Sequence, residues 1–375
     1  MHTDGIQRDG FYVVSLINDR KEEIIMEKTL RYGVIGAGVF AGIHMSQLSV
    51  MPNTKVMAIC DKHIESAKEL AAKYGVANVY DDYNKMLERD DIDCVAVVTA
   101  DKAHKDATVA ALRAGKHVLC EKPMSLFIDE CKEMIKTAEE TGKVLMVGQI
   151  CRFAPGFVKA KELVDNGVIG ELFYVESEYA HDYAKIPGVD GWRADADRDP
   201  IIGGACHAID LLRWIAGDPT EVTAYSNHKV LRDWPVNDCT VSLFKFPNDV
   251  IGKVFTSIGC KRNYTMRTVL YGDKGTIVVN NTDPVLKLYL ERENENSAEI
   301  DPNLYDHTVG HDIEVSINNH NVRGEHEGFR ATILENAPLL MTGKEGAKTV
   351  AVCCAVVESA KSGQAVKVDY EALEK

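Results

Sequence analysis

The chain has 375 residues, 45% of them hydrophobic, and a formal net charge of −14 at pH 7. This length and composition predict a globular protein of two domains. The acidic balance argues against nucleic acid or an anionic membrane as a partner, because such surfaces are bound through excess Lys and Arg. No apolar run reaches bilayer length and no signal-peptide pattern stands at the N-terminus, so we expect a cytoplasmic protein without a membrane partner. The ten cysteines lack metal-ligand spacing, which favours reduced core thiols and no metal site.

Residues 1–25 precede a second methionine, Met26, and include "RKEE", which purine-rich codons resembling a bacterial ribosome-binding site can encode. Our hypothesis is that Met26 is the start and that residues 1–25 are a non-native or disordered leader. The alternative is a genuine but poorly packed extension. We place a dinucleotide-binding domain at residues 27–150 and a substrate-binding and oligomerisation domain at residues 151–375.

The first half of the chain alternates short apolar runs with helical segments. The runs read "LRYGVIG", "TKVMAIC", "DCVAVVT", "HVLCE" and "VLMVGQ", and the predicted helices follow through His44, at 64–74, near 104–114 and at 126–141. Strands that are apolar at every position are buried on both faces, which requires helices above and below a parallel sheet. We therefore predict an α/β, doubly wound Rossmann domain.

A dinucleotide fingerprint follows the first strand. In "VIGAGVFAGIH", Gly36, Gly38 and Ala41 occupy the G-x-G-x-x-G/A positions, which serve the tight turn, the approach of the pyrophosphate and close helix packing. We expect Val39 and Phe40, which lie between them, to contact the cofactor too. Asp61 ends the next strand, where a carboxylate accepts hydrogen bonds from ribose hydroxyls and repels a 2′-phosphate. The pattern predicts NAD as cofactor, with NADP possible because Lys62 and His63 are adjacent.

The ends of the following strands face the same crevice, because ligands of open α/β sheets bind beyond the carboxyl ends of the strands. Thr99 therefore lies beside the cofactor, with His104 one helical turn on, although a helix-start histidine is more often structural. Glu121 and Lys122 end the next strand at the same edge. A lysine there could stabilise or relay the proton of a substrate hydroxyl, whereas spacing alone favours a solvated surface lysine.

Seven segments together resemble the Gfo/Idh/MocA family, named for glucose-fructose oxidoreductase and inositol dehydrogenase. They are "GAGVFAGIH", "AICD", "EKPMS", "VGQICRFAPGF", "GWRAD", "CHAIDLLRW" and "ESAKSGQAVKV". The resemblance runs from about Leu30 to the C-terminus. It implies a Rossmann domain followed by an α/β domain with a large open mixed, mainly antiparallel sheet, whose helix-covered face closes over the nicotinamide.

The resemblance also implies roles for single residues. Lys122 would lie beside the nicotinamide and the reacting hydroxyl, Gln149 near the cofactor, and Arg152 in the cleft. His207 matches the family's acid/base histidine, and Asp210 lies one helical turn on. One position departs from the family: the aspartate often found four residues before the histidine is here Gly203. Either Asp210 or a loop acid such as Asp195, Asp197 or Asp199 orients His207, or the chemistry differs from simple oxidation.

The second half, read alone, predicts long strands of alternating polarity after a helix at 157–166. A wide sheet with a half-exposed face favours a homodimer or homotetramer. The loop "GWRADADRDP" holds Trp192 and Arg193, which either contact a sugar or serve as packing and surface charge. We expect two closing helices, at 328–336 and 347–361.

These features predict an NAD(P)-dependent dehydrogenase that moves a hydride between nicotinamide and a secondary hydroxyl of a sugar, inositol or related cyclic polyol. His207 would take the proton, Lys122 would hold the oxygen, and Asp210 would orient the histidine or bind substrate. Two alternatives stay open. One is a glycoside-cleaving enzyme that oxidises a sugar carbon transiently and eliminates the aglycone, and the other is a non-catalytic sugar or dinucleotide sensor.

Overall fold

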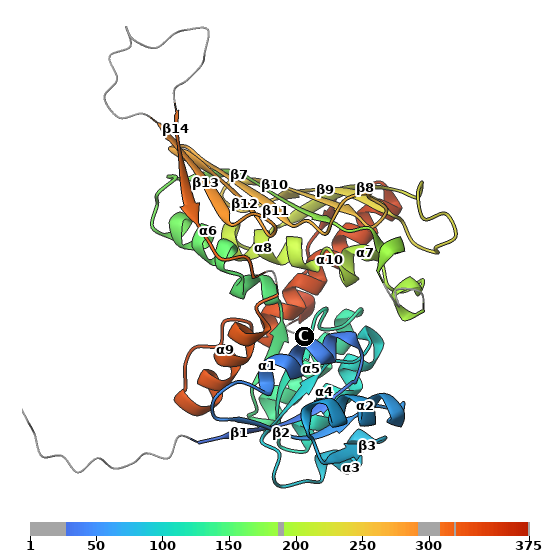
Figure 1. The fold of residues 1–375 in the computed structure, drawn as a ribbon. Coiled ribbons are helices and arrows are strands. Elements are labelled where there is room, and N and C mark those ends of the chain that lie inside the picture. Colours follow the sequence, from blue (N-terminus) through green and yellow to red (C-terminus); the bar gives the residue numbers. More distant parts are fainter. Residues whose placement is uncertain (1–27, 187–190, 292–307, 319, 374–375) are drawn as a thin grey trace, which may run out of the picture.

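The computed structural model describes residues 28–186, 191–291, 308–318 and 320–373. The expected leader, residues 1–25, lies outside the described residues. The described chain builds two β-sheets, one at each end of the molecule, with helices packed between them (Figure 1). Within the described part, no helix has both the length and the apolar character that crossing a membrane requires.

The first sheet is parallel and has the strand order β3-β2-β1-β4-β5-β6. Its strands are β1 (Leu30–Ile35), β2 (Thr54–Cys60), β3 (Asn78–Tyr80), β4 (Cys94–Val97), β5 (His117–Glu121) and β6 (Leu145–Gly148). Its helices are α1 (Val39–Leu48), α2 (Ile64–Tyr74), α3 (Tyr83–Leu87), α4 (His104–Arg113) and α5 (Ile128–Thr141). The order reverses between β1 and β4, which opens a crevice at their carboxyl ends. The predicted doubly wound domain is confirmed.

The second sheet has nine strands in the order β14-β13-β12-β11-β7-β10-β9-β8-β15. They are β7 (Leu172–Ala180), β8 (Glu221–Asn227), β9 (Cys239–Lys245), β10 (Ile251–Ser257), β11 (Arg267–Gly272), β12 (Gly275–Asn280), β13 (Val285–Glu291), β14 (Thr308–Glu314) and β15 (Val366–Lys367). Strands β7 and β10 pair in parallel and the other described pairs are antiparallel. The predicted mixed, mainly antiparallel sheet is confirmed.

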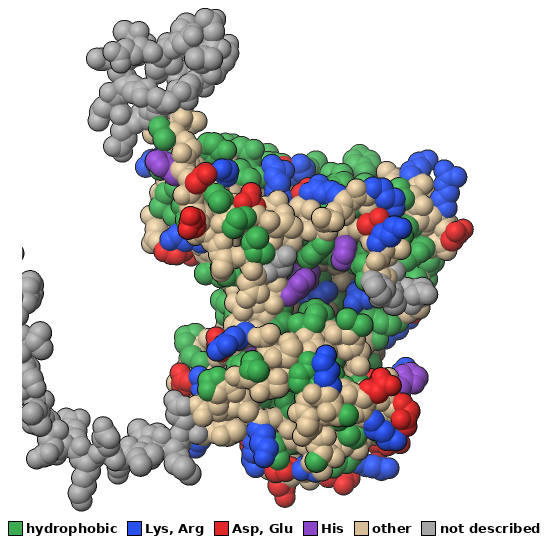
Figure 2. All heavy atoms as spheres, viewed as in Figure 1, with side chains coloured by type: hydrophobic (Ala, Val, Ile, Leu, Met, Phe, Trp, Pro, Cys, Tyr) green, Lys and Arg blue, Asp and Glu red, His purple; other side chains and the backbone are tan. Residues whose placement is uncertain are grey.

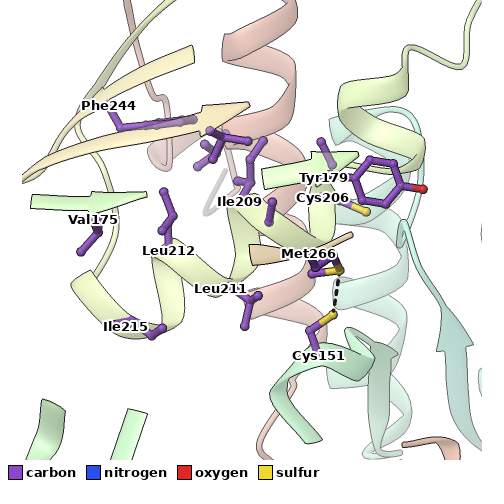
Figure 3. Close-up of a cluster of buried hydrophobic side chains, with 14 of the residues drawn as sticks. Cys151, Val175, Tyr179, Cys206, Ile209, Leu211, Leu212, Ile215, Phe244 and Met266 are labelled. Carbon is purple, nitrogen blue, oxygen red and sulfur yellow. Dashed lines mark hydrogen bonds between the residues drawn. The ribbon is translucent and has the colours of Figure 1, made fainter. Parts of the chain in front are cut away.

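One face of the second sheet is covered by helices that lie between it and the Rossmann domain (Figure 1). These are α6 (Pro155–Asp165), α7 (Pro200–Gly203), α8 (Cys206–Ala216) and α10 (Gly343–Ser362). Helix α8 turns Ile209, Leu212 and Ile215 into the core, together with Val175 and Phe244 of the sheet (Figure 3). This packing fixes α8, and hence the residues at its start, against the sheet.

The two closing helices join the domains. Helix α9 (Val322–Glu335) buries Phe329 in the Rossmann core, and α10 contributes Val350 to the same core. Both helices begin earlier than predicted. The side chain of Asn321 caps α9 by accepting a hydrogen bond from the Gly324 N–H, and Thr342 caps α10 through the Glu345 N–H. The extra first turn of α9 carries Glu325 and His326 into the protein.

All ten cysteines are free thiols, and most are buried. This confirms the prediction of reduced thiols.

Candidate active site

The fingerprint turn lies directly against the end of β4. Gly36 has φ of +109°, and a Cβ there would stand 2.3 Å from the carbonyl oxygen of Val98. A side chain at this position is excluded by both its φ and its neighbour. Gly38 caps α1 and faces open space, with nothing within 4 Å of an added Cβ. Val39 beside it is 85% exposed, whereas Ala41 is fully buried against the sheet. This open, glycine-lined helix start fits a pyrophosphate held by backbone N–H groups.

Asp61 lies at the end of β2 and braces this turn. One carboxylate oxygen accepts a hydrogen bond from the Ala37 N–H at 2.7 Å, and the other accepts from the His63 N–H at 2.8 Å. Each oxygen retains lone-pair capacity for a ribose hydroxyl. The residues present therefore fit a dinucleotide with free ribose hydroxyls.

Thr99 and His104 follow β4, as expected, but His104 has no nitrogen free for a cofactor. Its ring is 1% exposed and bridges the carbonyl oxygens of Pro123, at 2.8 Å, and Thr99, at 3.2 Å. Burial opposes the charge, yet Cys120, Asp101 and the Pro123 carbonyl raise the pKa of His104 to about 10. We correct the expected cofactor contact: His104 ties together the loops after β4 and β5.

Lys122 follows β5 directly and points across to the second domain. Its Nζ donates a hydrogen bond to the carbonyl oxygen of Gly203 at 3.2 Å, and the peptide bond to Pro123 is cis. An ammonium group has three donors, so two remain for a ligand. Lys122 is therefore held between the domains and is not a freely solvated surface lysine.

His207 lies in the first turn of α8, four residues after Gly203, whose carbonyl oxygen Lys122 contacts. Burial and the Lys122 charge hold the pKa of His207 well below its ordinary value. Its Nδ1 is buried and has no hydrogen-bond partner among the described residues. The side chain is thus a neutral imidazole, able to accept a proton.

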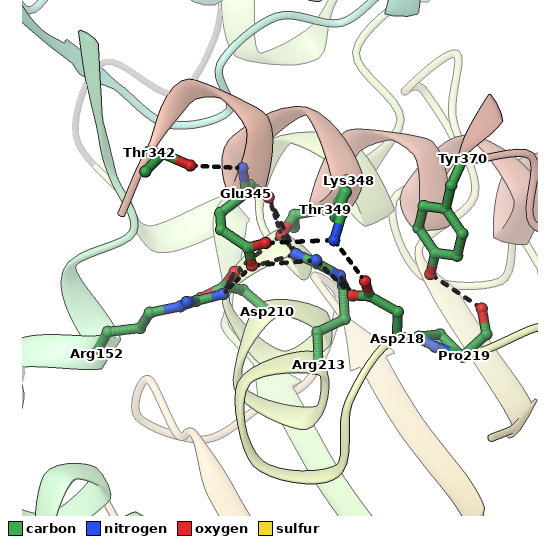
Figure 4. A network of polar contacts seen from close by, with 10 residues as sticks. All are labelled: Arg152, Asp210, Arg213, Asp218, Pro219, Thr342, Glu345, Lys348, Thr349 and Tyr370. Carbon is green, nitrogen blue, oxygen red and sulfur yellow. Dashed lines mark hydrogen bonds and ion pairs between the residues drawn. The ribbon is translucent and has the colours of Figure 1, made fainter. Parts of the chain in front are cut away.

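Asp210 and Arg152 belong to a buried network instead of the cleft (Figure 4). Arg152 donates two hydrogen bonds to the Asp210 carboxylate, at 2.7 and 2.8 Å, and Thr349 donates a third at 2.8 Å. Asp210 is fully buried and Arg152 is 4% exposed. The Asp210 carboxylate is thereby enclosed by its partners, and neither oxygen is open to the cleft. We expected Asp210 to lie beside His207 or the substrate and Arg152 to line the cleft. Both predictions are wrong, because the two residues form a buried structural ion pair.

The loop acids do not replace the missing aspartate either. Asp195 and Asp197 pair with Lys102, at 2.7 and 2.9 Å, and Asp199 caps α7 by accepting from the Ile201 N–H. None of these three carboxylates makes a hydrogen bond to His207 in the described chain.

Gly203 itself is required by a buried arginine. The guanidinium carbon of Arg198 lies 2.3 Å from a Cβ built at Gly203, and Arg198 also donates to the Gly203 carbonyl at 2.8 Å. Asp101 balances its charge through a 2.7 Å contact. A carboxylate side chain at position 203 would therefore collide with Arg198.

Trp192 and Arg193 lie in a short helical turn, Trp192–Ala194, and neither is buried. Trp192 is 40% exposed, and the guanidinium groups of Arg193 and Arg198 lie 4.6 and 5.0 Å from its ring centroid. Burial and the charge of Arg193 lower the pKa of His181 to about 4.

Glu121 and Gln149 are buried behind the cofactor crevice. Glu121 is 5% exposed and accepts the Lys122 N–H and a contact from His44. Gln149 is 1% exposed, and its Oε1 has no hydrogen-bond partner among the described residues.

Sequence reasoning missed three side chains around Lys122 and His207. The rings of Tyr264 and His320 stack with centroids 5.8 Å apart, and His181 lies 4.7 Å from Tyr264. The His320 centroid is 6.3 Å from that of His207 and 6.0 Å from that of Phe40. Figure 2 shows histidine side chains in the hollow between the two lobes. No local spacing signals this group, because its members come from three distant segments.

Two family models match the chain. One, described as "Oxidoreductase family, NAD-binding Rossmann fold", matches residues 30–149, and the other, "GFO/IDH/MocA C-terminal domain", matches residues 157–278. Among solved structures, "Levoglucosan dehydrogenase, complex with NADH" superposes with a TM-score of 0.82 at 23% identity, covering 91% of this chain and 99% of that one. That likeness concerns the fold.

Curated relatives include dehydrogenases of two kinds. D-glucoside 3-dehydrogenase of Escherichia coli (strain K12) is 35% identical over 209 residues, which cover 54% of this chain and 58% of that protein. Myo-inositol 2-dehydrogenase of Thermotoga maritima is 29% identical over 262 residues, 67% of this chain and 75% of that protein. Since the two family models together match more than half of the chain, the protein belongs to the Gfo/Idh/MocA family of NAD-binding oxidoreductases.

Proposed function

We propose that this protein is an NAD-dependent dehydrogenase that oxidises a secondary hydroxyl of a sugar, inositol or related cyclic polyol. The observation that carries the proposal is the hydrogen bond from Lys122, at the Rossmann edge, to the Gly203 carbonyl just before α8, whose first turn holds His207. His320 links the two domains there, because its ring lies 6.3 Å from that of His207 and 6.0 Å from that of Phe40. The names of the relatives, a glucoside dehydrogenase and an inositol dehydrogenase, support the substrate class.

The cofactor would be held by the backbone around Gly36 and Gly38, with Asp61 on the ribose and Phe40 and Thr99 along its length. When bound, NAD supplies the hydride acceptor. Asp61 favours NAD over NADP, because its carboxylate would repel the negatively charged 2′-phosphate of NADP. Gln149 remains a proposed neighbour of the cofactor, because the unpartnered Oε1 is a free acceptor.

The proton of the substrate hydroxyl would pass to His207. Its Nδ1 is enclosed by protein, so Nε2 would be the nitrogen offered to the substrate. A low pKa keeps the ring unprotonated at neutral pH, which is the form that a general base needs. In the same step, Lys122 would donate a hydrogen bond to the hydroxyl oxygen and stabilise its developing negative charge.

The rest of the cleft would bind the sugar. His181, His320, Tyr264 and Trp192 combine ring faces with hydrogen-bonding edges, and Arg193 adds a donor at the rim. Such a surface suits a ring that carries several hydroxyl groups.

The test is a panel of glycosides, inositols and sugar acids with NAD, followed by NADH absorbance. Lys122→Ala should lose most turnover, by about 10²- to 10³-fold, as expected for a lost oxyanion donor, while NADH binding stays near wild type. The matched control is Lys68→Ala on α2, where the lysine is exposed. Full activity of Lys122→Ala would refute its role.

One observation keeps a second function open. His207 and His320 give the site two imidazoles instead of one imidazole and a carboxylate. After oxidation of a glycoside carbon to a ketone, the second imidazole could remove the proton from the adjacent carbon as the aglycone leaves. The aglycone would leave with a proton, water would add to the double bond that elimination forms, and the hydride held by the cofactor would return to the ketone carbon. Release of the aglycone from aryl glycosides without net NADH would favour this function.

We also propose that the protein forms a homodimer or homotetramer through the helix-free face of the second sheet. Five apolar side chains stand exposed on that face: Tyr225, Val241, Leu243, Ile251 and Tyr289. Exposed apolar patches of this kind mark association surfaces. Light scattering after gel filtration should show an oligomer, and Leu243→Lys should convert it to monomers. A monomeric wild-type protein would contradict the proposal.

A further inference from the structure

A buried polar cluster lies directly behind Lys122 and is not used in the proposed chemistry. It consists of Tyr32 on β1, His44 on α1, Glu121 on β5, and Glu325 and His326 on α9. Glu121 is 5% exposed and the other four are fully buried. Three segments distant in sequence thus bring two carboxyl groups and two imidazoles into the same apolar surroundings.

Four of the five side chains form one hydrogen-bonded chain. Glu121 Oε2 accepts the Lys122 N–H at 3.0 Å, and Glu121 Oε1 lies 2.9 Å from His44 Nε2. His44 Nδ1 lies 2.9 Å from His326 Nε2, and His326 Nδ1 lies 3.3 Å from the Tyr32 hydroxyl. With both imidazoles neutral, the Tyr32 hydroxyl can donate to His326, His326 to His44, and His44 to Glu121. The chain then needs no charge besides that of Glu121. The chain thereby satisfies Glu121 as an ionised acceptor.

Glu325 is left out of this chain. Neither of its carboxyl oxygens has a hydrogen-bond partner in the described part of the protein. Burying an ionised carboxylate without a partner or solvent costs far more free energy than burying the neutral acid, so such groups take up a proton. Burial and the neighbouring Glu121 accordingly raise the pKa of Glu325 well above its ordinary value.

The two carboxyl groups meet at Gly148, the last residue of β6. A Cβ built on Gly148 would lie 3.0 Å from Glu325 Oε1 and 3.2 Å from Glu121 Oε1. A carboxylate oxygen of Glu325, a carboxylate oxygen of Glu121 and an imidazole nitrogen of His44 all lie within 4.8 Å of one another. The missing side chain of Gly148 therefore lets the two carboxyl groups face each other without a hydrogen bond between them.

We propose that Glu325 is a buried, protonated carboxylic acid that faces the Glu121 carboxylate across the space at Gly148, and that it is a positioning residue for Lys122. Because Glu121 holds the Lys122 N–H, the neutral state of Glu325 spares Glu121 a second buried negative charge and so keeps the end of β5 in place where Lys122 starts. The cluster also ties α9 to α1, whose first turn carries the fingerprint. The link to Lys122 catalysis rests on the proposed function, whereas the protonation of Glu325 does not.

The first test needs no substrate. Infrared difference spectra of the full-length protein, wild type minus Glu325→Gln, should show the carbonyl stretch of a protonated carboxyl at neutral pH. The matched control, Glu327→Gln on the same helix, should show only an ionised carboxylate, because Glu327 is exposed. A carboxylate signal from Glu325 would overturn the proposal. So would a stoichiometric divalent metal in the purified protein that Glu325→Gln loses, since a bound cation would then replace the proton.

The second test is the pH dependence of stability. The titratable groups around Glu325 are Glu121 and His44, its chain neighbour His326, and Tyr32 and Cys151, whose pKa values its charge would raise. Above pH 4.5 the unfolded state releases the Glu325 proton and the folded state keeps it. The free energy of unfolding of the wild-type protein therefore decreases as the pH rises. Glu325→Gln should therefore gain stability relative to wild type as pH rises from 5 to 8, and Glu327→Gln should not. A flat or opposite difference would overturn the proposal.

The third test is kinetic, with the sugar that the substrate panel identifies. Glu325→Gln keeps a neutral donor and should retain kcat within about threefold, whereas Glu325→Ala should lower kcat about 10²-fold, as a shift of the catalytic group does, with NADH affinity unchanged. Equal damage in both variants would refute the positioning role. If Glu325→Ala does not fold, the isosteric Gln variant still decides the first two tests. If no substrate turns over, the dehydrogenase proposal fails while the protonation proposal stands or falls on its own readouts.

Discussion

Asp210→Asn separates a structural carboxylate from a catalytic one. Asp210 is fully buried and accepts three hydrogen bonds of 2.7–2.8 Å, two of them from Arg152. Removing the charge leaves the Arg152 guanidinium buried, with a 3.4 Å contact to Glu345 as its remaining ion pair in the described chain.

Breaking a buried ion pair costs about 3–5 kcal/mol, and the remaining Glu345 contact favours the lower end. At about 2–4 °C per kcal/mol for a domain of this size, Asp210→Asn should lower the melting temperature by about 6–12 °C. If Asp210 instead oriented His207, the substitution would lower kcat about 10⁴-fold, as it does for the orienting aspartate of a Ser-His-Asp triad.

The assay is thermal unfolding by circular dichroism together with kcat per folded molecule, measured well below the transition. Asp218→Asn is the control, because Asp218 belongs to the same network but is 33% exposed. We expect a large stability loss and kcat within about twofold for Asp210→Asn, because the pair lies outside the reacting atoms. A stable protein with a kcat lowered by orders of magnitude would refute the reasoning.

Three further predictions follow from the site. Gly36→Ala should lower NADH affinity at least about tenfold in fluorescence titrations, because the fingerprint turn cannot keep its φ; Gly42→Ala, which faces open space, should not. His320→Ala should raise the KM for the sugar about 3- to 10-fold, the value of one hydrogen bond, with an unchanged KM as the contrary result. Burial and the charge of Lys122 lower the pKa of His207 in the folded state, so the unfolded state binds more protons below pH 6.5 and the free energy of unfolding decreases as the pH is lowered. In urea titrations, His207→Asn should lose less stability than wild type between pH 6.5 and 5, and equal losses would contradict this.

Most of the fold could be predicted because apolar periodicity reports burial directly. The buried runs ending at Asp61 and Lys122 predicted the parallel sheet, and the alternation through Leu243 predicted the half-exposed one. The start of α9 was missed because its cap, Asn321, is a single polar residue in a polar segment.

The site was predictable only in part. Glycine positions and strand ends follow from local rules, so the places of Gly36, Asp61 and Lys122 at the ends of the parallel strands could be predicted. Partners of a buried charge depend on segments far apart in sequence, so the pairing of Asp210 with Arg152 was not visible. The same reason hid the stack of His320 on Tyr264.

The most direct test of the central proposal is a deuterium transfer experiment. The protein is incubated with NAD and sugars or inositols deuterated at the carbon of a secondary hydroxyl, and the reduced nicotinamide is analysed by mass spectrometry. We predict that deuterium appears in the cofactor with the wild-type protein and not with Lys122→Ala. A wild-type protein that binds NAD and these sugars but transfers no deuterium would contradict the proposed dehydrogenase.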